Sequence, residues 1–113
     1  MKIIKDQITI KEIKEMAQKM FGNFVKAVVD IEDEIIAIDA ELHADLEVFL
    51  MENGAKQENL WGINIYPEIF GEERVEFDSM INLKPSLGNQ TRGVENSQIR
   101  EKIFKIVDKL VKN

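Results

Sequence analysis

The stretch FVKAVVDIEDEIIAID, residues 24–39, decides the fold of this chain. Two runs rich in β-branched residues, 24–31 and 35–39, flank the acidic tripeptide 32–34. Such runs around a short polar connection are typical of an antiparallel hairpin. Because little of either run is polar, we expect both strands to lie inside a sheet rather than at its edge.

A helix is expected just before this hairpin. Thr9 and Glu12 have the spacing of a capping box, in which each side chain satisfies a backbone N–H of the first turn. Apolar residues then recur at helical spacing from Ile13, and Gly22 suits a left-handed C-terminal position. The pattern predicts a helix over about 10–21.

Two more helices follow the hairpin. The first is expected over about 41–53, with Asp39 as its N-cap and Asn53-Gly54 as its stop. The last is expected to begin at Asn96 or Ser97, because a regular apolar stripe runs from there towards the C-terminus.

Alternating polarity predicts two further strands, over 60–66 and 75–83. Between them, Ile69 and Phe70 are expected to pack on the core or on a partner. Residues 84–95 contain proline and glycine without periodicity, so we expect a long irregular loop there.

These elements predict a single α+β domain over residues 1–113. The expected order is helix-strand-strand-helix-strand-strand-helix, with an antiparallel four-stranded sheet and the helices packed on one face.

Composition restricts the class of protein. The chain has 113 residues and a formal net charge of −6, with 44% hydrophobic and 32% charged residues. Its hydrophobic share is too high for a disordered chain, no apolar run is long enough for a bilayer span, and no cysteine is present. The acidic balance argues against binding many nucleic-acid phosphates. Because the start MKIIKDQITI also lacks a secretory h-region, we expect a cytoplasmic protein that contacts neither membrane nor nucleic acid.

One candidate site surrounds the chain's one histidine. His43 follows Asp39 by one helical turn, and carboxylates with a neutral imidazole can share a divalent metal. The polar face of the predicted strand 75–83 adds Asp78 and leads to Lys84. The candidate catalytic residues are therefore Asp39, His43, Asp78 and Lys84, and the candidate metal ligands are the first three. A histidine that only helps the first helical turn, and an ordinary exposed sheet face, explain the same residues without chemistry.

A second candidate site lies in the loop before the last helix. The candidate ligand-binding residues are Asn89, Thr91, Arg92 and Gly93. Helix N-termini favour anions, and an arginine adds a bidentate donor. The spacing of Gly88 and Gly93 resembles a P-loop, but Val94 and Glu95 stand where that motif needs lysine and serine or threonine. The alternative is that Arg92 pairs internally with Glu95, Glu76 or Asp78.

Four segments carry a family resemblance: DAELHADLE (39–47), WGINIYP (61–67), EFDSMINLKPSLGN (76–89) and TRGVE (91–95). With them the chain resembles a family of short bacterial and archaeal proteins described as a domain of unknown function. The resemblance covers nearly the whole chain and implies one self-contained domain. It brings no activity, cofactor or catalytic residue.

Three functional hypotheses follow from the sequence. The first is a small binding or regulatory domain that recognises an anionic small molecule or a protein partner, at the 84–95 loop and the start of the His43 helix. The alternative is a metal-assisted hydrolase acting on a phosphate-containing substrate, in which Lys84 and Arg92 stabilise the oxyanion. The third is assembly of a homo-oligomer through Trp61, Ile69 and Phe70.

Overall fold

The central hairpin forms as the sequence predicts. In the computed structural model, which describes residues 1–113, β3 (Val25–Asp30) and β4 (Ile35–Ile38) pair antiparallel. The Asp30 carboxylate closes the turn, because its Oδ1 accepts the backbone N–H groups of Glu32 at 3.0 Å and Asp33 at 3.3 Å.

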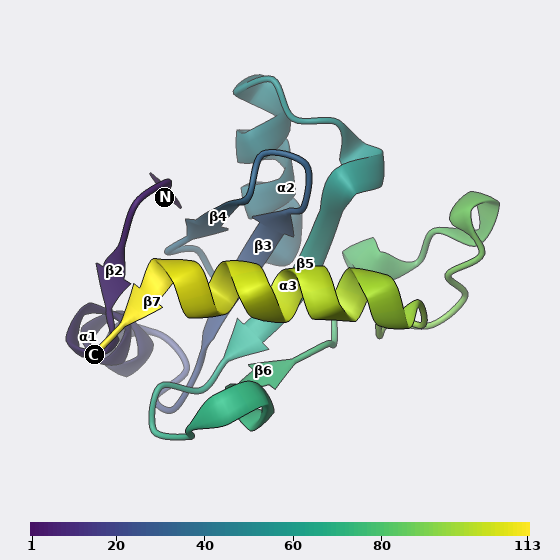
Figure 1. Cartoon of the computed structure of the whole chain (residues 1–113). Coiled ribbons are helices and arrows are strands. Elements are labelled where there is room, and N and C mark those ends of the chain that lie inside the picture. Colours follow the sequence, from purple (N-terminus) through teal and green to yellow (C-terminus); the bar gives the residue numbers. More distant parts are fainter.

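The hairpin lies in the middle of a five-stranded antiparallel sheet with the order β1-β4-β3-β5-β6 (Figure 1). The outer elements are β1 (Lys2–Ile4), β5 (Leu60–Ile65) and β6 (Val75–Glu76). The expectation of four strands is therefore wrong. Strand β1 was not predicted, since three residues give too short a pattern to identify.

The predicted strand 75–83 is also corrected. Only Val75 and Glu76 pair with β5, and a 3-10 turn occupies Met80–Asn82. The Ser79 hydroxyl starts that turn by accepting the Ile81 N–H at 3.2 Å. The segment after Glu76 therefore packs along the sheet without forming a strand. Side-chain hydrogen bonds hold it there in place of backbone pairing, although its polarity alternates as in a strand.

Helices cover both faces of the sheet, which corrects the expectation of one covered face. Helices α1 (Ile10–Lys19) and α3 (Ser97–Leu110) pack on the face that carries the larger apolar cluster. Helix α2 (His43–Glu52) packs on the other face through Leu46 and Leu50. Figure 1 shows α3 crossing in front of the sheet with α2 behind it.

The two ends of the chain are tied together. A short parallel pair joins β2 (Ile8–Thr9) to β7 (Val111–Lys112), directly before α1 and after α3. This pair was not predicted. The expected start of α3 is confirmed, because the Asn96 side chain accepts the N–H groups of Gln98 and Ile99.

The predicted capping box of α1 is confirmed. The Glu12 N–H donates to the Thr9 hydroxyl oxygen at 3.1 Å, and the Thr9 N–H donates to the Glu12 carboxylate. We expect Thr9→Ala to lower the unfolding free energy by about 0.5–2 kcal/mol. Thr9→Ser keeps the hydroxyl and should lose much less. Urea denaturation of the three proteins measures this, and equal midpoints for both variants would contradict it.

Helix α2 starts later than predicted and without a side-chain cap. Its N-cap is Leu42, whereas Asp39 adopts a left-handed conformation with φ 77° at the end of β4. Aspartate tolerates this conformation better than most residues. Asp39 therefore turns the chain instead of capping the helix. The expected stop is confirmed, since Asn53 is the C-cap and Gly54 has φ 98°.

The exposure of Ile69, Phe70 and Trp61 differs from what the expected core packing and oligomer contact require. Phe70 is 87% exposed and Ile69 is also exposed, so neither is tucked onto the core. Trp61 is only 2% exposed and cannot form an outer contact surface. The longest helix has 14 residues, and no helix qualifies as a membrane span.

Candidate functional site

The site is built along the incomplete edge of β5. Strand β6 pairs only with Asn64 and Ile65, which leaves the backbone of Gly62 without a strand neighbour on that side. The side chain of Asn82 takes the place of a strand. Its Oδ1 accepts the Gly62 N–H at 2.8 Å, and its Nδ2 donates to the carbonyls of Gly62 at 3.0 Å and Arg92 at 2.9 Å.

A second asparagine organises the 84–95 loop. The Asn89 Nδ2 donates to the carbonyls of Asn82, Thr91 and Gly93, and its Oδ1 accepts the Glu95 N–H at 2.8 Å. This buried amide has no donor left for a ligand. Asn89, predicted as ligand-binding, therefore holds the loop together.

The other predicted loop residues are engaged as well. The Thr91 hydroxyl accepts the Gly93 N–H at 3.2 Å. The Arg92 Nε donates to the Asp78 Oδ1 at 2.6 Å, with both side chains about half exposed. The structure thus contains the internal pairing that the sequence left open as an alternative, with Asp78 as the partner.

His43 lies on the sheet beside this pair. Its Nε2 is 2.8 Å from the Ile63 carbonyl, so Nε2 carries the proton and donates. Gly62 makes this packing possible, because a Cβ at that position would lie 3.2 Å from His43 Cδ2 and 2.5 Å from Ser79 Cβ. Burial lowers the pKa of His43, the Ile63 hydrogen bond raises it, and the charges of Lys26, Asp78 and Arg92 act more weakly.

The lowered pKa of His43 predicts a pH dependence of folding. Below its unfolded pKa of about 6.5 the unfolded chain binds the proton more readily than the folded one, so acid should favour unfolding. We expect the unfolding free energy to fall between about pH 7.5 and about pH 5.5 by more in the natural protein than in His43→Gln. Urea denaturation at several pH values measures both slopes, and parallel slopes would contradict the assignment.

Lys84 occupies a separate position at the start of β5. Its Nζ donates to the Gln57 carbonyl at 3.1 Å and lies 5.3 Å from the centre of the Trp61 ring. Burial lowers the pKa of Lys84, and the charge of Glu47 partly opposes this. Glu47 is itself buried, and its Oε2 has no hydrogen-bond partner.

The predicted metal ligands do not form a centre. No group of three or more histidine, aspartate or glutamate side chains lies close enough together to hold a metal ion. Of Asp39, His43 and Asp78, the last two approach closely enough for the Asp78 charge to affect the pKa of His43. Asp39 instead ends β4 in its left-handed turn.

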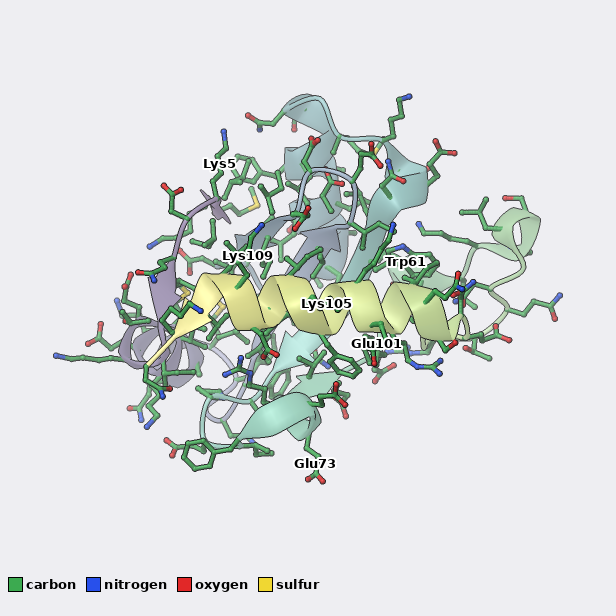
Figure 2. All side chains as sticks on the ribbon, in the orientation of Figure 1. Lys5, Trp61, Glu73, Glu101, Lys105 and Lys109 are labelled. Carbon is green, nitrogen blue, oxygen red and sulfur yellow. The ribbon has the colours of Figure 1, made fainter.

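A groove of about 520 Å³ lies on the side of the 84–95 loop that faces α3. We call it the Trp61 groove. Its walls come from β5, the loop and the start of α3, and its lining residues are Ile31, Glu58, Asn59, Trp61, Leu87, Gly88, Asn89, Glu95, Asn96 and Ile99. Figure 2 shows Trp61 beside the first turns of α3. The Trp61 indole N–H is buried and has no acceptor.

The family model described as Protein of unknown function (DUF5674) matches residues 2–110. The chain belongs to this family. No significant match was found among curated proteins or solved structures. The DUF5674 match covers all three helices and the whole five-stranded sheet, so the domain and the Trp61 groove belong to one unit.

Sequence reasoning missed the groove and the role of Asn82. The alternation of 60–66 predicts that Trp61, Ile63 and Ile65 share one face of the strand, and all three belong to the larger apolar cluster. Nothing in that pattern indicates that Glu58 and Asn96, 38 residues apart in the sequence, meet around it.

Proposed function

We propose that this protein is a small-molecule-binding domain, that its site is the Trp61 groove, and that its ligand is an organic amine. The observation that carries the proposal is the lining of the groove, which combines apolar side chains with the carboxylates of Glu58 and Glu95 and includes no basic residue.

The lining defines the class of ligand. Four apolar side chains offer a surface for a hydrocarbon body, while Glu58 and Glu95 supply two carboxylates and no lysine or arginine lines the groove. Part of Glu95 is used within the loop, because its Oε2 accepts the Gln90 N–H. These charges favour a cationic ligand over the anion expected from the sequence.

The other sequence-based ligand hypotheses have less support. Arg92 already has a carboxylate partner in Asp78, and the Asn89 amide is used inside the loop. The hydrolase alternative needs a metal set that Asp39, His43 and Asp78 do not form. A binding function therefore agrees better with the geometry.

The protein offers a direct assay, because Trp61 is its single tryptophan. We expect spermidine or agmatine to change the Trp61 emission in a saturable way and to raise the unfolding temperature. Inorganic phosphate and adenosine monophosphate should do neither. Glu58→Gln should weaken amine binding by about tenfold, the size expected for losing one partly desolvated charge contact.

Glu73→Gln is the matched control. Glu73 is an exposed carboxylate, and Figure 2 shows it on the side of α3 opposite to Trp61. Glu73→Gln should therefore leave amine binding unaltered. Equal weakening by both variants would mean that the amines respond only to net charge. A response to the anions without one to the amines would restore the anionic ligand in place of this proposal.

A further inference from the structure

Helix α2 has an apolar stripe on its solvent side. Ala44, Val48 and Met51 follow the i, i+4, i+7 spacing of one helical face, and all three are exposed. Val48 is 52% and Met51 is 42% exposed. The opposite side of the helix buries Leu46 and Leu50 against the sheet. Helix α2 is thus apolar on two sides, and the chain itself covers only one of them.

A buried charge lies next to this stripe. Glu47 precedes Val48 and is one turn from Ala44 and Met51, so it borders the stripe. Its Oε2 has no partner, and no ion pair within 4 Å joins it to Lys84. A buried carboxylate without a partner is unfavourable. An incoming cation would relieve this cost.

The surrounding charges have one sign. Helix α2 contains no lysine or arginine, and Glu41, Asp45 and Glu52 are exposed on it or just before it. A two-fold contact between the α2 stripes of two copies would bring these like charges together. A partner surface with apolar side chains between basic ones fits the same face without repulsion.

We propose that this face of α2 docks a basic amphipathic helix from another protein. Its apolar side chains pack on Val48 and Met51, and one of its lysine or arginine side chains pairs with Glu47. This is the helix-on-apolar-surface mode of recognition, with charge selecting the partner. The site is separate from the Trp61 groove and does not depend on its ligand, since the two share no lining residue.

A defined peptide tests the proposal. The probe is a dye-labelled synthetic helix with leucines at i, i+3, i+4 and i+7 and lysines beside them, and its binding to the whole protein is followed by fluorescence anisotropy. We expect saturable binding that Val48→Asp weakens by at least about tenfold. Glu47→Gln should weaken it several-fold, and by less as salt is added.

Two controls make the result specific. Phe70→Asp introduces the same charge at the most exposed large apolar side chain, away from α2, and should leave the affinity unchanged. A scrambled peptide of equal charge without helical periodicity should bind at least about tenfold more weakly. Because Val48 is exposed, Val48→Asp should keep the natural unfolding midpoint, which urea denaturation checks.

Three outcomes would overturn the proposal. The first is absence of binding by the helical peptide. The second is equal binding by the scrambled peptide or by Val48→Asp, which would mean general charge attraction. The third is a doubled mass in light scattering that Val48→Asp abolishes, which would make a second copy of the chain the occupant.

Discussion

Replacing Asn82 with alanine should lower the unfolding free energy by about 3 kcal/mol or more. The change leaves the Gly62 N–H and the Gly62 carbonyl without a partner, and it removes one of the two hydrogen bonds that the Arg92 carbonyl accepts. Asn82 is 0% exposed, so water cannot replace the amide without opening the structure. Each buried polar group left unpaired costs about 1–3 kcal/mol. Urea denaturation measures the loss.

A second substitution, Asn82→Asp, distinguishes the hydrogen bond that the Asn82 side chain accepts from the two that it donates. Asn82→Asp keeps an oxygen for the Gly62 N–H but loses both donated hydrogen bonds and turns a carboxylate towards two carbonyl oxygens. We therefore expect Asn82→Asp to be less stable than Asn82→Ala at neutral pH.

Asn53→Ala is the control for Asn82. The Asn53 Nδ2 also donates to a backbone carbonyl, that of Phe49 at 2.8 Å, but this residue is exposed at the end of α2. Its loss should cost about 1 kcal/mol or less. If the two alanine variants unfold at the same urea concentration, Asn82 does not substitute for a strand.

The elements that local chemistry specifies were predictable from the sequence. Thr9 and Glu12 define the start of α1 through groups three residues apart, and Asn96 does the same for α3. The hairpin of β3 and β4 needs only a short connection between two apolar runs. In each case the residues that decide the structure are close together in the chain.

The missed elements depend on distant residues. Strand β1 forms because Lys2–Ile4 pairs with β4, whose residues come more than 30 positions later in the sequence. The segment after Glu76 leaves the sheet because an asparagine side chain satisfies Gly62 from 20 residues away. An asparagine in such a role has the same local pattern as one in an ordinary turn, so sequence periodicity cannot distinguish them.

The candidate site was likewise predictable only in part. His43, Asp78 and Arg92 were selected by residue type, and the structure places them near one another. Their chemistry was not predictable, since it depends on which groups are already paired. Asp78 holds Arg92, the amide of Asn89 is fully used, and Trp61 keeps the unpaired donor.

Replacing Gly62 with alanine should also be strongly destabilising, by about 2–3 kcal/mol. The added Cβ would lie 2.5 Å from Ser79 Cβ and 2.6 Å from Ser79 Oγ, closer than such atoms can approach. Ser79 cannot retreat easily, because its N–H donates to the Arg92 carbonyl at 2.9 Å and its side chain is buried. Overpacking of a filled interior typically costs about 1–3 kcal/mol. Urea denaturation measures it.

Two further variants identify the clash as the cause. Ser79→Gly removes both nearest atoms, so the pair Gly62→Ala with Ser79→Gly should be more stable than the sum of the single losses predicts, by about 1 kcal/mol or more. Gly93→Ala is the matched control, because a Cβ there would meet the Phe77 carbonyl at an ordinary 3.5 Å and should change stability by no more than about 0.5 kcal/mol. Strict additivity of Gly62→Ala and Ser79→Gly would show that Gly62 is required for a reason other than room for Ser79. In that case the contact of His43 with the sheet, 3.2 Å from the same Cβ position, becomes the steric constraint that Gly62 satisfies.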